Sequence, residues 1–184
     1  MADTVSPDDP VYLEPLGEEH DTASFCSRAA YLDWYLSNRA LADQKNDLSR
    51  TNVAVNDPAL GGAPGSKRIE GFVTLEAGTM PTATVLNADG SPRFAENQIS
   101  IIYLSCLARD VRRRGHGYGD ILLIEALRRA HLASAHIGVA GVFLYSLEEG
   151  VSLYLRHGFE PFADDPKRLF LPMSTIRQLF QNAS

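Results

Sequence analysis

The chain has 184 residues, of which 45% are hydrophobic and 22% are charged, a balance typical of a globular protein that buries a full core without disulfides or metals. Its net charge of −6 argues against a strongly basic nucleic-acid-binding face, and no apolar run approaches the roughly 18 residues of a membrane span. The acidic N-terminus does not resemble a signal peptide, and the two cysteines, far apart in sequence, indicate a reduced, cytoplasmic location.

The negative charge is unevenly distributed along the chain. The first 21 residues hold seven of the 23 acids and no lysine or arginine, so the rest of the chain carries 16 acids against 17 bases. That remainder is close to neutral and leaves room for a local basic patch. Its candidates are the arginines at 112–114 together with Arg128 and Arg129.

The first hundred residues combine one long helical pattern with short strand-like runs. Leu32, Tyr35 and Leu36 recur at helical spacing, which predicts an amphipathic helix over residues 27–45. The expected strands in this half are residues 11–17, 51–56 and 69–80. The expected loops, rich in glycine, proline, asparagine and aspartate, are residues 57–68 and 87–97.

Residues 99–108 form the strongest predicted strand. Both of its faces are mostly apolar, as expected for a central strand covered on both sides. A glycine-rich turn and a long helix follow it directly. The remaining expected elements are a helix at 118–135, a strand at 141–147, a short helix at 148–157 capped by Gly158, a strand at 168–173 and a short closing helix. The alternation predicts an α/β (α+β) fold, with an acidic tail at 1–10 and one domain at 11–184.

The turn itself, RRRGHGYGD at residues 112–120, has the features of an anion site. The first turn of a helix has unpaired N–H groups, and glycines without a Cβ let a phosphate lie directly against the backbone. A dinucleotide-binding fingerprint is excluded because Asp120 stands where its third glycine is required, and no Gly-Lys-Ser/Thr is present for a Walker A loop. The pattern Arg-x-x-Gly-x-Gly, running from Arg114 to Gly119, fits fully.

This pattern resembles the pyrophosphate loop of the GNAT acetyltransferase superfamily, whose members bind acetyl-coenzyme A. The flanks match as well, with Leu107-Ala108-Arg109 ending the core strand and LYLRHGF at 153–159. The resemblance covers residues 12–173 and implies the GNAT fold, a mixed, mostly antiparallel sheet flanked by helices with a splayed central strand pair. It also implies that acetyl-CoA, the acetyl donor, is bound by Leu107, Ala108, Arg109, Arg114, Gly115, His116, Gly117, Tyr118 and Gly119.

The resemblance implies direct acetyl transfer to an amine, with Tyr154 as the general acid that protonates the leaving thiolate. A phenol with a pKa near ~10 can donate a proton at neutral pH. The alternative is that Tyr154 only packs, and His157, Ser105 and Cys106 are interpreted as structural. Leu147 stands where many relatives carry a pantetheine-binding asparagine, and Ser146 is the candidate substitute. No metal is expected, because the sequence has no His, Cys and carboxylate cluster with ligand spacing.

Residues 25–43 and the segment DPKRLFLPM at 165–173 are similar to GNAT toxins of bacterial toxin–antitoxin modules. Those toxins acetylate the α-amine of aminoacyl-tRNA. A pI of about 5.3 is unusual for a protein that binds a polyanion, so the acceptor stays open between aminoacyl-tRNA and a small-molecule amine or protein N-terminus. A non-catalytic acyl-CoA-binding module is the further alternative. The partners considered are an antitoxin protein and a second copy of the chain; no membrane is involved.

Overall fold

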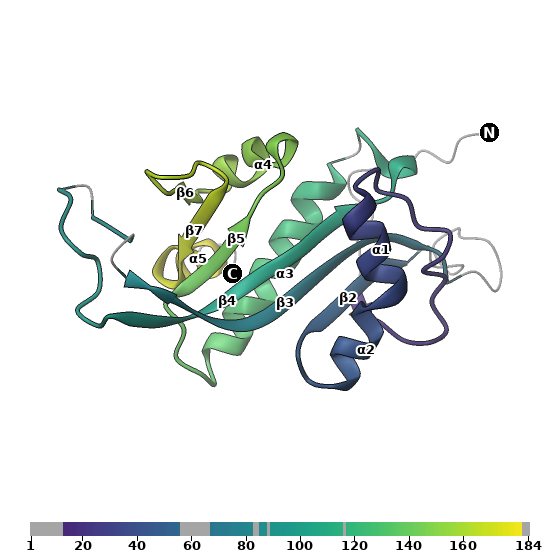
Figure 1. Cartoon of the computed structure of the whole chain (residues 1–184), viewed down its shortest axis with the longest axis horizontal. Helices are drawn as coiled ribbons and strands as arrows, with labels where there is room; N and C mark the ends of the chain where they lie inside the picture. The colour runs from purple at the N-terminus through teal and green to yellow at the C-terminus, as the bar shows by residue number, and fades with distance from the viewer. Residues whose placement is uncertain (1–12, 56–66, 83–84, 88, 116, 182–184) are drawn as a thin grey trace. The chain divides into compact units, whose positions relative to one another are not determined.

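The computed structural model describes residues 13–55, 67–82, 85–87, 89–115 and 117–181 (Figure 1). Its strands are β1 (Leu13–Pro15), β2 (Arg50–Val55), β3 (Ile69–Pro81), β4 (Gln98–Arg109), β5 (Gly141–Tyr145), β6 (Glu160–Pro161) and β7 (Arg168–Pro172). Its helices are α1 (Ala30–Asn38), α2 (Ala40–Lys45), α3 (Tyr118–Ser134), α4 (Val151–Arg156) and α5 (Met173–Gln181), with single 3₁₀ turns η3 (Val111–Arg113) and η4 (Glu148–Gly150).

The strands form one seven-stranded sheet in the order β1-β2-β3-β4-β5-β7-β6. The β4–β5 pair is parallel, whereas β1–β2, β2–β3, β5–β7 and β6–β7 are antiparallel. A mixed, mostly antiparallel sheet flanked by helices was the fold expected from the sequence, and it is confirmed. None of the helices in the described part of the chain has the length and apolar character needed to cross a bilayer.

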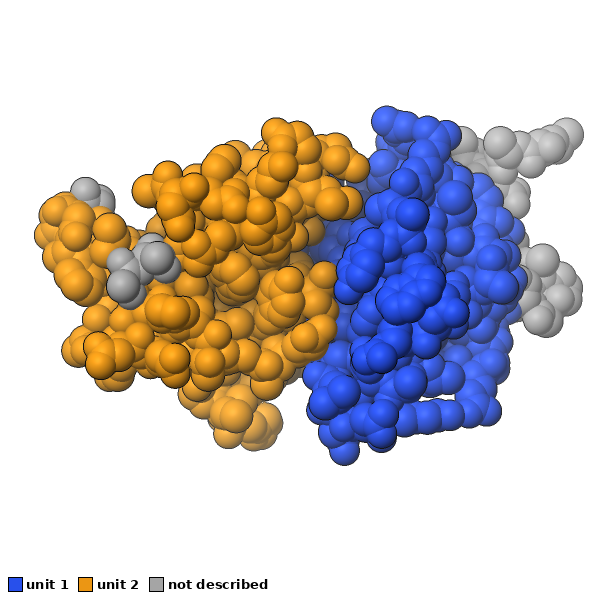
Figure 2. All heavy atoms as spheres, in the orientation of Figure 1, with its two compact units in different colours: residues 1–75, 106–125 blue, residues 76–105, 126–184 orange. Residues whose placement is uncertain are grey.

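The chain divides into two compact units, coloured separately in Figure 2. The first unit comprises residues 1–75 and 106–125, and the second comprises residues 76–105 and 126–184. The long elements β3, β4 and α3 each contribute residues to both units. The single domain expected over residues 11–184 stays a prediction, and the acidic tail at 1–10 lies outside the described residues.

Helices cover both faces of the strands in the first unit. Phe72 on β3 belongs to a buried cluster with Tyr35 and Leu36 of α1. Its neighbour Gly71 points to the opposite face, since successive strand residues alternate. A Cβ on Gly71 would lie 2.7 Å from Leu122 Cδ1 of α3 and 3.2 Å from the Ala108 carbonyl oxygen, so a larger residue would displace Leu122. β3 is therefore covered on both faces at this position.

The helix predicted over residues 27–45 is wrong in its extent, because the structure breaks it into α1 and α2 at Arg39. Near the break, the Ser37 hydroxyl and the Asn38 amide donate to the carbonyls of the residues four positions earlier, at 2.9 Å each. Such side-chain bonds to the backbone compete with helix continuation. The helix also starts later than predicted, at Ala30, after Arg28 adopts a φ of 73°.

The second unit contains the parallel β4–β5 pair. The paired residues are Ile102 with Val142 and Tyr103 with Phe143, and in the described chain pairing ends there although both strands continue. This early end is consistent with the splayed pair implied by the GNAT resemblance. Gly158 follows α4 with a φ of 84°, and the N–H of Phe159 donates to Tyr154 O, so the predicted glycine cap is confirmed. The strand expected at 141–147 stops at Tyr145, and β6 was not predicted.

Candidate active site

Asp110 lies between the end of β4 and the glycine-rich turn at 112–120, and its carboxylate binds backbone groups near both. Its carboxylate accepts hydrogen bonds from the N–H of Arg112 at 2.9 Å and from the N–H of Cys26 at 3.2 Å. The N–H of Val111 in turn donates to the Cys26 carbonyl at 2.8 Å. The turn is thereby fastened to the segment that leads into α1, in the same unit of the structure.

Asp110 also binds the Arg112 side chain in a two-pronged ion pair, with Nε 2.6 Å from Oδ1 and Nη2 2.8 Å from Oδ2. The Asp110 side chain is only 1% exposed. Burial by itself raises the pKa of this carboxyl, but the hydrogen bonds from Arg112 and Cys26 outweigh it and hold the pKa below its ordinary value of 3.8. Asp110 is therefore ionised at neutral pH and fixes Arg112 in place.

Replacing Asp110 with asparagine is expected to lower the free energy of unfolding at pH 7 by about 1–2 kcal/mol, a modest value because Arg112 is half-exposed and remains solvated. The folded pKa is depressed, so the carboxylate stabilises the fold above the unfolded pKa and loses this effect as pH falls through the folded pKa. The difference between wild type and Asp110→Asn should then shrink below about pH 4. Urea unfolding of both proteins at pH 7 and pH 3 measures it, and a constant difference would contradict the assignment.

A second buried carboxylate, Glu70 on β3, binds one residue before Gly115 and one residue after Gly117. Its side chain is 6% exposed and forms an ion pair with Arg113, which is itself 13% exposed. The Tyr118 hydroxyl donates to the same carboxylate at 2.9 Å. Burial raises the pKa of Tyr118 strongly, and the negative charge of Glu70 adds to the effect, so this phenol stays protonated as a hydrogen-bond donor.

The basic patch expected from the sequence is smaller than the sequence suggests. Asp110 and Glu70 neutralise two of the three consecutive arginines, and Arg128 and Arg129 belong to the second unit rather than to the unit of the turn. Arg114 is exposed, and among the described residues it forms no ion pair. Arg114 is thus the arginine of this turn whose charge is available to an anion in solution.

The glycines of the turn have the conformation that close approach to an anion requires. Gly115 and Gly117 have φ values of 85° and 67°, a left-handed region that favours glycine. A Cβ built on either would meet no described atom within 4 Å, so both face open space. Gly119 lies in the first turn of α3, where peptide dipoles add partial positive charge. His116, also assigned to this site, lies outside the described residues.

The remaining predicted coenzyme contacts are at the end of β4. Ala108 is buried in the core of the first unit, and its neighbours Leu107 and Arg109 are half-buried on the other face of the strand. All the described residues predicted to bind the coenzyme therefore belong to one unit. Sequence reasoning missed Glu70, although an acid inside the apolar run IEGFV is a recognisable signal of a buried, paired carboxylate.

Tyr154, the predicted general acid, belongs to the second unit and is 8% exposed on α4. Its ring packs edge-to-face on Phe159, with 5.6 Å between ring centroids, so the aromatic ring is held in one orientation. Ser146, the candidate substitute for the pantetheine-binding asparagine, is 3% exposed and its hydroxyl donates to the Leu147 carbonyl at 2.7 Å. That hydroxyl is already engaged within the protein.

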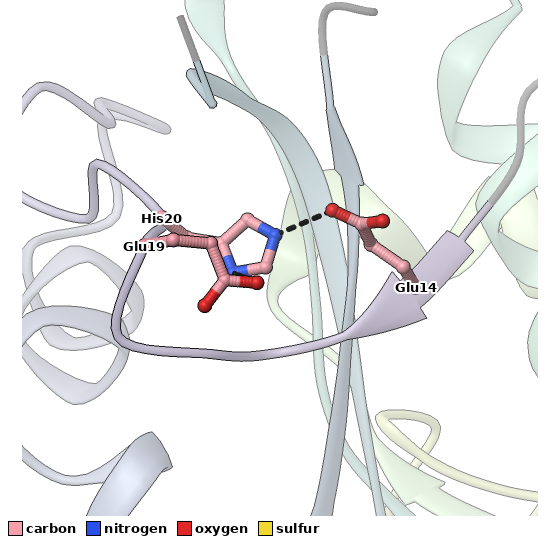
Figure 3. A group of neighbouring side chains, drawn as sticks. All are labelled: Glu14, Glu19 and His20. Atoms are coloured by element: carbon pink, nitrogen blue, oxygen red, sulfur yellow. Dashed lines mark hydrogen bonds and ion pairs between the residues drawn. The ribbon is translucent and has the colours of Figure 1, made fainter. Parts of the chain in front are cut away.

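Glu14, Glu19 and His20 come together in the first unit, a grouping that was not predicted from the sequence (Figure 3). The cluster has ligand atoms within 4.8 Å of one another, but its groups already have partners. His20 Nε2 donates to Glu14 Oε1 at 2.7 Å, and His20 Nδ1 accepts the N–H of Gly17 at 2.8 Å. Lys67 Nζ lies 2.6 Å from the same Glu14 oxygen and balances its charge. A cation would have to displace these bonds, so we interpret the cluster as structural.

Removal of metals is accordingly expected to leave acetyl-transfer activity unchanged. Both ring nitrogens of His20 are already engaged, and no step of direct acetyl transfer requires a Lewis acid. Initial rates measured before and after dialysis against a chelator test this expectation. Activity lost on dialysis and restored by zinc would contradict it.

No protein-family model matches the chain. Curated proteins do match it, among them two toxins. The probable toxin TacT of Sinorhizobium fredii is 31% identical over 176 residues, covering 91% of this chain and 93% of that protein. A tRNA-acetylating toxin of Mycobacterium tuberculosis is 32% identical over 168 residues, covering 89% of this chain and 93% of that protein.

Among solved structures, AtaT complexed with acetyl-methionyl-tRNAfMet superposes with a TM-score of 0.81 at 22% identity, covering 93% of this chain and 99% of that one. AtaT has also been solved with its antitoxin AtaR and acetyl-CoA, as a mutant with one tyrosine changed to phenylalanine. This likeness concerns the fold, whereas the two relatives extend the match to the sequence of nearly the whole chain. The chain therefore belongs to the family of GNAT-type tRNA-acetylating toxins of bacterial toxin–antitoxin modules.

Proposed function

We propose that this protein transfers the acetyl group of acetyl-CoA directly to the α-amine of aminoacyl-tRNA. The observation that carries the proposal is its 32% identity to a tRNA-acetylating toxin over 89% of the chain. A match of that extent includes both units of the structure, and so both the glycine-rich turn and the helix that carries Tyr154.

The geometry of the turn supports pyrophosphate binding. Gly115 and Gly117 leave open space beside a left-handed backbone, and Arg114 supplies a positive charge that no described acid neutralises. The start of α3 adds N–H groups and the positive end of the helix dipole. These are the features that a doubly charged pyrophosphate requires of a protein surface.

Bound acetyl-CoA supplies the acetyl group as a thioester, and the protein has to orient it and protonate the departing sulfur. We assign the proton to the Tyr154 hydroxyl, because a phenol donates at neutral pH and recovers its proton from the ammonium product. The backbone at Leu107 and Arg109 is the proposed contact of the pantetheine arm, and an N–H there polarises the thioester carbonyl.

The acidic pI is compatible with a tRNA substrate because the acids of the N-terminal region are partly neutralised within the protein. Glu14 pairs with Lys67, and Glu18 pairs with Lys45. Beyond residue 21 the chain carries 17 lysines and arginines against 16 acids. The net charge nevertheless favours one alternative, a small cationic amine as the acceptor, which the experiment below includes.

The acceptor is tested by incubating the purified protein with labelled acetyl-CoA and aminoacyl-tRNA. We expect label on the amino acid, released as the N-acetyl derivative when the ester is hydrolysed and identified by mass spectrometry. Uncharged tRNA and formyl-methionyl-tRNA, which has no free α-amine, are the matched controls. Label on polyamines or on peptide N-termini, with none on aminoacyl-tRNA, would favour the alternative acceptor. Coenzyme binding without turnover of any acceptor would favour a non-catalytic module.

We further propose that the protein acts in the cytoplasm and is neutralised by an antitoxin protein, by analogy with AtaT bound to the C-terminus of AtaR. A homodimer is proposed as its assembly. Expression in a bacterium should arrest growth, and co-expression of the cognate antitoxin should relieve the arrest. Sedimentation of the purified protein measures its oligomeric state.

A further inference from the structure

Arg113 and Tyr118, which enclose Gly115 and Gly117 in the sequence, bind the same buried carboxylate. Arg113 immediately precedes the segment 114–117 and Tyr118 immediately follows it, and both side chains bind Glu70 on β3. The Arg113 guanidinium also lies 6.0 Å from the centroid of the Tyr118 ring, so the two flanking residues contact each other as well. The separation in sequence is 43 residues for Arg113 and 48 for Tyr118.

Glu70 is well suited to this role because β3 holds it firmly. Its backbone carbonyl accepts the N–H of Asp110 at 2.8 Å, which joins β3 to the residue between β4 and the turn. Its neighbours Ile69 and Gly71 are buried, and Arg68 contributes a second cation at 3.5 Å. A buried carboxylate with two arginines and a phenol as partners has little freedom to move.

Glycine-rich segments bind anions well only if they are ordered beforehand. Glycine has more backbone freedom than any other residue type. Fixing Gly115 and Gly117 on binding would therefore cost free energy and lower the affinity. Because Arg113 and Tyr118 both bind one firmly held carboxylate, Gly115 and Gly117 between them lose much of that freedom before the ligand arrives. Neutralisation by Arg113 also prevents the carboxylate of Glu70 from repelling a phosphate.

We propose that Glu70 is a positioning residue that orders the glycine-rich turn through Arg113 and Tyr118 and so sets the affinity for the pyrophosphate half of acetyl-CoA. Glu70 does not touch the coenzyme. The inference rests on the proposed function of the turn. It predicts that the effect of Glu70 is confined to donors that carry a pyrophosphate.

The test compares two acetyl donors at a fixed, saturating acceptor concentration: acetyl-CoA and S-acetylpantetheine, which lacks the pyrophosphate and the nucleotide. Glu70→Gln keeps the size of the side chain and removes its charge. We expect the KM for acetyl-CoA to rise about tenfold, the size of one lost hydrogen bond to a charged group. The kcat with either donor should stay unchanged, and so should the KM for S-acetylpantetheine. Tyr118→Phe keeps the ion pair between Arg113 and Glu70 and should raise the KM for acetyl-CoA by about threefold.

A double variant separates positioning from simple charge neutralisation. Glu70→Met with Arg113→Met removes the buried pair together, which often leaves stability intact. If Glu70 only neutralised Arg113, this variant would regain the wild-type KM for acetyl-CoA; if Glu70 positions the turn, the KM stays raised. Glu14→Gln is the control. It also removes a carboxylate from the first unit, but the partners of that carboxylate are His20 and Lys67 rather than residues of the turn. It should leave both donors unaffected.

The outcomes separate this inference from the function on which it rests. A wild-type protein that uses both donors with equal KM would show that the turn binds no pyrophosphate, and it would overturn both. A wild type that prefers acetyl-CoA, with a Glu70→Gln variant that is unchanged or equally impaired on both donors, would overturn the role of Glu70 alone. Thermal unfolding of each variant shows whether equal impairment comes from a damaged fold.

Discussion

Replacing Gly117 with valine is expected to abolish the binding of acetyl-CoA, with a loss of affinity of at least 100-fold. Gly117 has a φ of 67°, which a β-branched residue adopts only with strain of roughly 1–2 kcal/mol. Its missing Cβ faces open space, where the proposed pyrophosphate approaches the backbone. A valine side chain would occupy that space as well as displacing the turn. Isothermal titration calorimetry of the purified variant measures the effect.

Gly90 provides a matched control for this substitution. It has a φ of 82° and, like Gly117, no described atom within 4 Å of a Cβ built upon it. Gly90→Val therefore carries the same backbone strain at a site in the other unit of the structure. We expect it to lower thermal stability slightly and to leave acetyl-CoA affinity unchanged. Unchanged affinity in Gly117→Val would place the coenzyme elsewhere.

Replacing Tyr154 with phenylalanine is expected to slow acetyl transfer by roughly 10²-fold while leaving coenzyme binding intact. The substitution keeps the ring and its edge-to-face contact with Phe159, and removes only the acidic hydroxyl. An effect at the low end of general-acid catalysis is expected, because a coenzyme A thiolate is already a tolerable leaving group. The decrease should appear equally in kcat and in kcat/KM, as for an interaction made mainly in the transition state.

Tyr145 provides the comparison for Tyr154, because it lies in the same unit and is exposed. Its hydroxyl donates to Asp165 at 2.8 Å, so Tyr145→Phe also removes one hydroxyl from a tyrosine. We expect that variant to retain full turnover. Full turnover in Tyr154→Phe would instead mean that Tyr154 only packs, and lost binding or a lowered melting temperature would mean that its hydroxyl holds the coenzyme or the fold.

The sequence by itself determined the order of the elements, because hydrophobic periodicity is a local property. The central strand, the long helix that follows it and the Gly158 cap were all located from runs of a few residues, and the structure confirms them. The Arg-x-x-Gly-x-Gly pattern likewise identified the family. It is recognisable in sequence because all of its residues belong to one turn, where the chain itself fixes their spacing.

Only the tertiary structure decided which charges of that turn remain available. Three consecutive arginines are equivalent in sequence, but Asp110 neutralises Arg112 and Glu70 neutralises Arg113, so Arg114 is left exposed. The partner of Arg113 is 43 residues away, on a strand that becomes its neighbour only when the sheet forms. Local periodicity shows which residues are buried, but it does not show which distant residues become neighbours when the sheet forms. For the same reason the sequence missed the grouping of Glu14, Glu19 and His20.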